Sequence, residues 1–169
     1  MFRFNETNES FFSERPRARG FFGIGLYKPK IEINVGTLFR TAAIFGCNFM
    51  FTIGHRYKHQ RSDTMKSHRH IPLFHYESFD DFKVHLPKCS SLVGVELTQN
   101  ARPIRNFIHP KQAVYMLGAE DNGIDENILR QCDHVIKLPG DVSLNVSVAG
   151  SIVLYDRIGK VKEIDGSRQ

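Results

Sequence analysis

The chain has 169 residues, a length that suits one domain with a hydrophobic core of its own. Hydrophobic residues make up 41% and charged residues 24%, which is the composition of a globular protein and excludes a disordered chain. No run of about 18 apolar residues is present, so we expect neither a membrane-spanning helix nor a secretory signal. The formal net charge of +5 is compatible with a polyanionic partner.

The three cysteines, Cys47, Cys89 and Cys132, are odd in number, far apart and outside any CxxC pair. Such a set indicates neither a disulfide framework nor a nucleophile signature. Reduced thiols in a cytosolic or organellar protein are the simplest interpretation. We therefore expect a cytoplasmic protein.

Residues 1–20 are predicted to form a flexible basic arm that precedes a single domain of residues 21–169. Arg15, Arg17 and Arg19 stand close together at the end of this arm. They either contact phosphate groups or belong to a solvated tail, and the sequence leaves both interpretations open.

The first half of the domain alternates between predicted strands and helices. Residues 21–27 form a short apolar segment typical of a strand, and Asn34 stands where a helix N-cap is expected. Gly46 marks the expected end of this helix. Ser78 is the predicted N-cap of a second, short helix. Two further strands are expected at 48–53 and 71–76.

The second half continues this alternation. A helix capped by Asp125 precedes the last strand, and a final helix over 144–158 carries Val148, Ile152 and Tyr155 on one stripe. This rhythm predicts an α/β domain with a largely parallel sheet and helices on both faces. The three strands of this half are expected at 91–97, 113–117 and 134–138.

A strongly basic segment, residues 55–70, lies between two of the predicted strands. Arg, Lys and His dominate it and Asp63 is its only acid, so the segment repels itself unless an anion approaches. RNA contact is one interpretation and a solvated loop is the other. Spaced histidines are also present, but no cysteine accompanies them, so no metal site is predicted. The side chains expected to contact RNA here are Arg56, Lys58, Arg61 and Arg69.

Small and polar residues follow three of the predicted strands, at 97–100, 117–123 and 138–145. In an open parallel α/β sheet a ligand binds beyond the carboxyl ends of the strands, so these loops are expected to line one site. Their glycines allow close approach of the backbone. Ser143 stands in the last loop, where capping of the final helix is an alternative role.

Several common catalytic signatures are absent from the sequence. It contains no GxGxxG after a strand, no GxxxxGK[ST], no GxSxG and no HExxH. Their absence weighs against dehydrogenases, P-loop NTPases, serine hydrolases and zinc proteases.

Three segments resemble the motifs of the SpoU/TrmH RNA methyltransferases. The stretch NVGTLFRTA at 34–42 is similar to motif 1, N-x-G-x-x-x-R-x-A, and LGAEDNGI at 117–124 is similar to motif 2, G-x-E-x-x-G-[IL]. IKLP at 136–139, followed by SLNVSVA at 143–149, resembles motif 3, although Gly150 replaces its usual second alanine. The motifs occur in the family's order and spacing, and the resemblance extends over roughly residues 23–158.

This resemblance implies the SPOUT fold, in which the C-terminal part of the α/β domain is threaded into a deep trefoil knot. Nothing in the periodicity of the sequence points to a knot. The resemblance also implies a homodimer with the active site near the subunit interface. The implied reaction transfers a methyl group from S-adenosylmethionine to a ribose 2′-hydroxyl of RNA, with tRNA favoured over rRNA.

The motifs also imply roles for single residues. Arg40 is expected to bind the phosphate beside the target ribose and to stabilise the developing alkoxide. It is less suited to act as a general base, because guanidinium groups keep their proton in proteins. Asn34, Glu120 and Asn145 complete the expected catalytic set. The residues expected to contact the cofactor are Leu97, Gly118, Ile136, Leu138, Ser143 and Leu144.

Two other functions stay open at this point. One is a non-catalytic module that keeps the fold and binds RNA without a cofactor. The other is a related enzyme that methylates a base instead of a ribose. The presence of Arg40, Ser143 and Asn145 favours an enzyme over the non-catalytic module.

Overall fold

The structure is a computed structural model that describes residues 20–58 and 67–166, with side chains as far as Lys160. The predicted N-terminal arm, apart from its last residue, and Arg61 in the basic segment lie outside the described residues.

Seven parallel strands form one sheet in the order β3-β2-β1-β6-β4-β7-β5. Every pairing between neighbours is parallel, which confirms the predicted sheet. The sequence did not reveal the two-residue strand β5, which is too short to show a periodic pattern. The strands are β1 (Phe21–Tyr27), β2 (Phe49–Ile53), β3 (Leu73–Tyr76), β4 (Ser91–Val95), β5 (Arg102–Pro103), β6 (Gln112–Leu117) and β7 (His134–Lys137).

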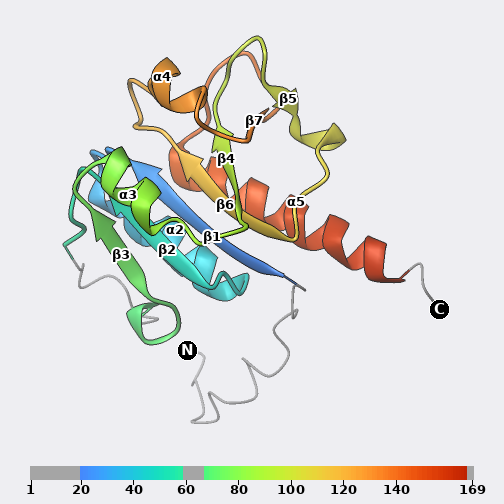
Figure 1. The fold of residues 1–169 in the computed structure, drawn as a ribbon, viewed down its shortest axis with the longest axis horizontal. Helices are drawn as coiled ribbons and strands as arrows, with labels where there is room; N and C mark the ends of the chain where they lie inside the picture. Colours follow the sequence, from blue (N-terminus) through green and yellow to red (C-terminus); the bar gives the residue numbers. More distant parts are fainter. Residues whose placement is uncertain (1–19, 59–66, 167–169) are drawn as a thin grey trace, which may run out of the picture.

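Helices cover both faces of the sheet, as predicted (Figure 1). The long helices α2 and α5 pack together on one face over a core that includes Ile24, Leu38 and Val153. The short helices α3 and α4 lie on the other face over a second core, rich in aromatic rings. No helix of the described residues has the length and apolar character needed to cross a membrane. The helices are α2 (Glu32–Ile44), α3 (Phe79–His85), α4 (Glu126–Leu129) and α5 (Val146–Gly166), with single 3-10 turns η1 (Ser67–Arg69) and η2 (Ile104–Asn106).

The helix ends confirm some of the predicted caps and correct others. Ser78 accepts a hydrogen bond from the backbone N–H of Asp81 at 3.1 Å, and Gly46 follows α2 with φ +76°, both as predicted. The prediction that Asn34 caps α2 is wrong, because the helix begins two residues earlier and its N-cap is Ile31. Asp125 does precede α4, but its carboxylate accepts a hydrogen bond from the Tyr27 hydroxyl instead of capping the helix.

Strand β7 lies between β4 and β5, so the chain returns into the sheet between two strands that are neighbours in sequence. The segment that connects β4 to β5 therefore passes over the end of β7. The trefoil knot that the family resemblance implies stays a prediction.

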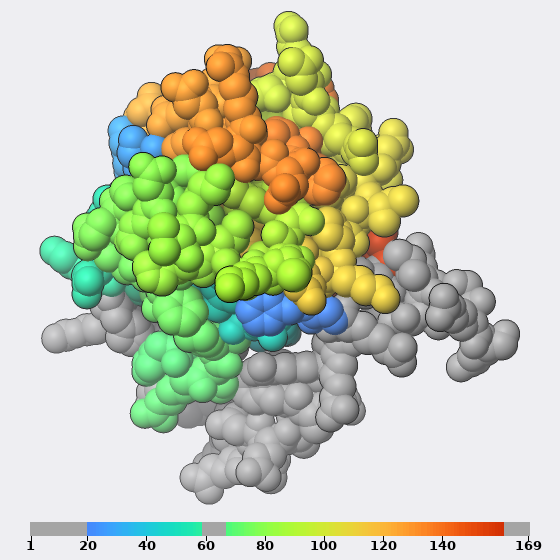
Figure 2. All heavy atoms as spheres, viewed as in Figure 1, coloured from blue at the N-terminus to red at the C-terminus, as the bar shows by residue number. Residues whose placement is uncertain are grey.

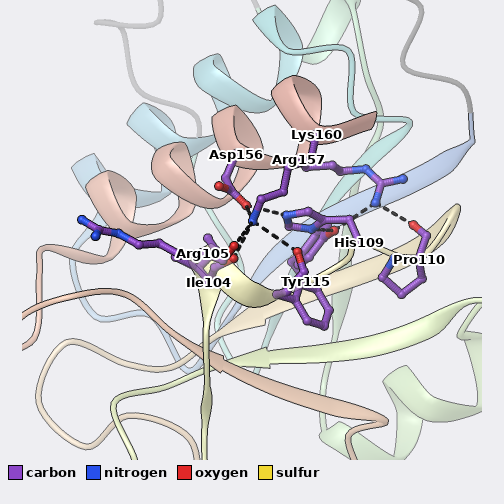
Figure 3. Close-up of polar contacts among 9 residues, drawn as sticks. Ile104, Arg105, His109, Pro110, Tyr115, Asp156, Arg157 and Lys160 are labelled. Carbon is purple, nitrogen blue, oxygen red and sulfur yellow. Dashed lines mark hydrogen bonds and ion pairs between the residues drawn. The ribbon is translucent and has the colours of Figure 1, made fainter. Parts of the chain in front are cut away.

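A buried arginine fastens α5 to the segment that leads into β6 (Figure 3). The Arg157 side chain is fully buried and lies over the Phe22 ring, 4.6 Å from its centroid. Its Nη1 donates to the Pro110 carbonyl at 2.7 Å and to the Tyr115 hydroxyl at 3.0 Å, and its Nη2 donates to the Lys111 carbonyl at 3.0 Å. The charge is thus compensated by fixed oxygens and a ring face, the condition under which a buried guanidinium is tolerated.

His109 completes this cluster from the other side. Its Nδ1 lies 2.6 Å from the Tyr115 hydroxyl and its Nε2 lies 2.8 Å from an Asp156 carboxylate oxygen. Burial lowers the pKa of His109 below its usual value, although the carboxylate of Asp156 acts in the opposite direction. The folded chain therefore favours the neutral form of the His109 imidazole.

This burial predicts a pH dependence of stability. The unfolded chain takes up a proton at His109 near its ordinary pKa of about 6.5 whereas the folded chain does not, so acidification favours unfolding. We expect His109→Gln to flatten the fall in free energy of unfolding below pH 7, by at most about 1.4 kcal/mol per pH unit. Urea denaturation at pH 8, 7 and 6 measures the slope. The exposed His85→Gln serves as the control, and equal slopes for the unmodified chain and His109→Gln contradict the prediction.

Candidate functional site

Three loops at the carboxyl ends of β4, β6 and β7 surround one cavity of about 280 Å³. They are the three loops that the sequence placed together, and the first turn of α5 closes the cavity through Val146 and Ala149. A parallel sheet directs the ends of its strands to one edge, and β4 lies between β6 and β7 in this sheet. The strand order therefore brings together loops that are distant in sequence.

Five of the six residues expected to contact a cofactor line this cavity. They are Leu97, Gly118, Leu138, Ser143 and Leu144. The sixth, Ile136, lies in β7 with a fully buried side chain and does not line the cavity. Its carbonyl accepts a hydrogen bond from the N–H of Glu96 at 2.9 Å, so Ile136 holds the backbone of a residue that does line the cavity.

The two glycines of the loop after β6 are required by a tight turn of the backbone. Ala119 and Gly123 exchange backbone hydrogen bonds at 3.1 and 3.3 Å. A Cβ atom on Gly118 would lie 2.1 Å from the Gly123 carbonyl carbon, and Gly123 itself has φ +61°. The spacing of these glycines therefore serves the chain's own turn, which shapes one wall of the cavity.

A continuous chain of hydrogen bonds joins the three motifs beside the cavity. The Asn145 amide donates to Asn34 Oδ1 at 3.0 Å, and the Asn34 amide donates to Glu120 Oε1 at 2.8 Å. Asn145 Oδ1 accepts the Ser147 backbone N–H at 3.0 Å, so Asn145 and not Ser143 caps α5. The motif residues Asn34, Glu120 and Asn145 are thus brought into direct contact across gaps of 86 and 111 residues.

The orientation of both amides in this chain is fixed from its two ends. A backbone N–H at the start of α5 requires the oxygen of Asn145, so the nitrogen of that amide must face Asn34. The same logic turns the Asn34 nitrogen toward Glu120, where only an acceptor fits. A carboxylate satisfies this requirement in its ionised form.

The surroundings of Glu120 favour that ionised form. Burial opposes ionisation, but hydrogen bonds from the Asn34 amide and the Lys30 backbone N–H outweigh it and hold the pKa of Glu120 below its usual value. Its neighbour Asp121 is paired with the Lys30 ammonium, which lowers the pKa of Asp121.

Arg40 stands apart from this cavity. It is exposed on α2, six residues after Asn34 and therefore about 9 Å further along the helix axis, and it does not line the cavity. Next to it along α2, Thr37 and Thr41 line a second, shallow groove between α2 and α5. The structure thus brings together three of the four expected catalytic residues and places the fourth on a neighbouring surface.

The described part of the basic segment is anchored to the start of α2. His55 Nε2 lies 2.8 Å from Glu32 Oε1, and the backbone N–H of Lys58 donates to Glu32 Oε2 at 3.2 Å. The side chains expected to contact RNA face solvent at the three described positions, Arg56, Lys58 and Arg69. Within the described residues no three His, Cys, Asp or Glu side chains are grouped to hold a metal.

Glu96 is a cavity residue that sequence reasoning missed. It follows β4 directly and its carboxylate accepts the backbone N–H of Ile124 at 2.8 Å, which ties two of the three loops together. The only signal in the sequence was its place at a strand end, one residue before the loop that begins at Leu97.

Comparison with known proteins identifies the family. Residues 22–155 match the SpoU rRNA Methylase family, so the chain is an α/β domain of a known class of RNA-modifying proteins. It belongs to the SpoU methylase family.

Relatives and solved structures agree with this membership. An uncharacterized tRNA/rRNA methyltransferase of Archaeoglobus fulgidus is 30% identical over 130 residues, which cover 72% of this chain and 57% of the relative. The tRNA (guanosine(18)-2′-O)-methyltransferase of Escherichia coli K12 is 28% identical over 129 residues, which cover 73% and 56%. The chain thus spans little more than half of these relatives. The structure of the A. aeolicus TrmH/SpoU tRNA modifying enzyme has the same fold, with a TM-score of 0.78, 21% identity and coverage of 93% and 85%.

The hydrogen-bond chain predicts the effect of neutralising Glu120. In Glu120→Gln an amide N–H₂ must face either the Asn34 amide or the Lys30 N–H, so one donor is left without an acceptor. We expect the free energy of unfolding to fall by about 1–3 kcal/mol at pH 7. The difference should shrink as the pH falls through the lowered pKa of Glu120, because the carboxylate contributes only when it is ionised.

Urea denaturation at pH 7 and at steps between pH 5 and pH 3 measures this difference. Asp141→Asn, in an exposed position of the loop after β7, is the matched loss of one negative charge. If Glu120→Gln is no less stable at pH 7 than Asp141→Asn, the hydrogen-bond chain does not stabilise the fold.

Proposed function

We propose that this protein transfers a methyl group from S-adenosylmethionine to the 2′-hydroxyl of a ribose in RNA. The observation that carries the proposal is the hydrogen-bond chain of Asn34, Glu120 and Asn145, which joins all three motifs at the rim of a cavity built from strand-end loops. Membership of the SpoU family and the names of the relatives support the same chemistry.

The residues around the cavity fit the cofactor. Apolar side chains of Leu97, Leu138 and Leu144 can contact a flat adenine ring, and Glu96 and Glu120 add negative charge that suits a cationic ligand. When bound, S-adenosylmethionine supplies a methyl group on a sulfonium, which is an excellent leaving group. A solved S-adenosylmethionine-bound rRNA methyltransferase of Sinorhizobium meliloti shares the fold, with a TM-score of 0.73, 22% identity and coverage of 87% of this chain and 59% of that one.

The protein's own task is to hold and activate the ribose hydroxyl. We assign to Arg40 the binding of the phosphate beside that ribose and the stabilisation of negative charge that develops on the oxygen. Asn34, Glu120 and Asn145 hold α2 against the start of α5, which fixes the place on the groove side from which Arg40 extends. In this assignment the guanidinium of Arg40 does not have to act as a general base.

We also propose that two copies of the chain form a dimer through the groove between α2 and α5. Val148, Ile152 and Tyr155 form one stripe of α5, yet they are 48%, 38% and 72% exposed. They line the groove together with Ile44 and Phe45 of the α2 region. An apolar stripe left open on an otherwise buried helix indicates a protein partner. Because Arg40 adjoins this groove and not its own cavity, a second copy brings an arginine toward a site that one chain leaves incomplete.

Exposed cations extend the proposed RNA surface from Arg40 along the basic segment. Arg56 and Lys58 lie in the part of the basic segment that Glu32 anchors to the start of α2, and Arg69 lies in η1. Such cations bind phosphate groups without reading sequence.

We propose tRNA as the substrate in preference to rRNA, in line with a fold neighbour described by the 2-OH methylation of C/U34 on tRNA. We also propose a cytoplasmic location, in line with the free cysteines.

Nucleoside analysis tests the reaction directly. Incubation with labelled S-adenosylmethionine and bulk tRNA should yield 2′-O-methyl nucleosides, and Arg40→Ala should reduce this product by about 100-fold or more while cofactor affinity changes less than about threefold. Arg130→Ala, which removes a surface ion pair with Glu126, is the control. Methylated bases instead of riboses would assign a different reaction, and unchanged activity of Arg40→Ala would refute its role.

A charge placed in the groove tests the dimer. We expect Ile152→Glu to convert the dimer to a monomer in sedimentation experiments, because a carboxylate at an apolar interface must be desolvated. Val84→Glu provides the matched control, since Val84 is 82% exposed on α3, on the opposite face of the sheet. A sedimentation coefficient that is unaffected by Ile152→Glu would place the interface elsewhere.

A further inference from the structure

The cavity wall has an unusual charge composition for a basic protein. Three carboxylates, Glu96, Glu120 and Asp121, line it, and none of its lining residues is Lys, Arg or His. The chain as a whole carries a formal charge of +5. Negative charge is therefore concentrated at the one place where a cofactor is proposed to bind.

Two of these three carboxylates are engaged elsewhere. Asp121 forms an ion pair with the Lys30 ammonium. Glu120 accepts the Asn34 amide and the Lys30 backbone N–H, and it belongs to the hydrogen-bond chain between the motifs. The charge of Asp121 is thus compensated by a cation, and neutralising Glu120 would disturb the hydrogen-bond chain.

Glu96 is held differently. Its Oε1 accepts the backbone N–H of Leu97 at 3.0 Å and its Oε2 accepts that of Ile124 at 2.8 Å. Two accepting oxygens are the arrangement of an ionised carboxylate. In the part of the chain that the structure describes, no lysine, arginine or histidine forms an ion pair with it. Its negative charge is therefore fixed in place by backbone dipoles and left uncompensated beside the cavity.

We propose that Glu96 is a specificity-determining residue that makes this cavity favour S-adenosylmethionine over its product, S-adenosylhomocysteine. The inference rests on the proposed function. Methyl transfer would break the sulfur–methyl bond, leave its electron pair on sulfur, form the oxygen–methyl bond and release the hydroxyl proton to water. The cofactor side thus changes from a net charge of +1 to a neutral thioether, and the attraction to the Glu96 carboxylate is lost at that moment.

This role differs from bracing the loops, which Glu96 also does. A Cβ atom on Gly123 would lie 2.4 Å from Glu96 Oε2, so the carboxylate packs tightly against the turn of motif 2. Loss of a brace deforms the cavity for both ligands alike. Loss of a charge weakens the binding of the cationic ligand only, so the ratio of the two affinities separates the two roles.

Titration calorimetry with S-adenosylmethionine and with S-adenosylhomocysteine provides the test. We expect the unmodified chain to bind the methylated ligand more tightly, and Glu96→Gln to reduce this preference by about five- to tenfold. Glu96→Asp should retain most of the preference because it keeps the charge. Asp141→Asn, in the loop after β7 but outside the cavity lining, should leave it unchanged.

Each outcome of this experiment decides the proposal. A lower preference in Glu96→Gln with a retained preference in Glu96→Asp supports it. Equal weakening of both ligands reduces Glu96 to a structural brace and overturns it. If Glu96→Gln does not fold, equal affinity of the unmodified chain for the two ligands overturns it as well. Failure of the unmodified chain to bind either ligand overturns the proposed function itself, and the role of Glu96 with it.

Discussion

The hydrogen bonds between Asn34, Glu120 and Asn145 connect three elements of the molecule that lie far apart in the sequence. The donor direction runs from the start of α5 to a carboxylate in the loop after β6, with α2 between them. Because each amide has one possible orientation, these bonds add to the packing of α2 against α5 in fixing the relative position of the three elements. The cavity, the groove between the long helices and the place of Arg40 all depend on that position.

Positive and negative side chains lie in different parts of this molecule. Cations face solvent along α2 and the basic segment, where an RNA backbone is proposed to lie. Acids line the cavity, where a cationic cofactor is proposed to lie. The one fully buried guanidinium, among the residues described, is Arg157, and carbonyl oxygens and the Phe22 ring compensate it. A net charge of +5 describes none of these three environments.

The sequence predicted the parallel sheet and the meeting of three loops, because apolar periodicity and the geometry of α/β sheets determine both. It failed where a side chain had two competing partners. Asn34 and Asp125 are good N-cap residues, yet each is held by a distant group, Glu120 and Tyr27 respectively. Strand β5 and the clamp around Arg157 were missed because they depend on contacts between distant segments that have no local pattern. Exposure of the α5 stripe was missed for a related reason, since periodicity indicates an apolar face but not what covers it.

The fixed orientation of the two amides also has a chemical consequence. Spontaneous deamidation turns an asparagine side chain into a carboxylate and replaces a donor nitrogen with an acceptor oxygen. At Asn34 the new carboxylate would face the ionised Glu120 across a distance of 2.8 Å, and two like charges that close repel strongly. A carboxyl group at position 34 would therefore replace a hydrogen bond with an unfavourable contact, and the link between the helix that carries Arg40 and the loop after β6 would weaken.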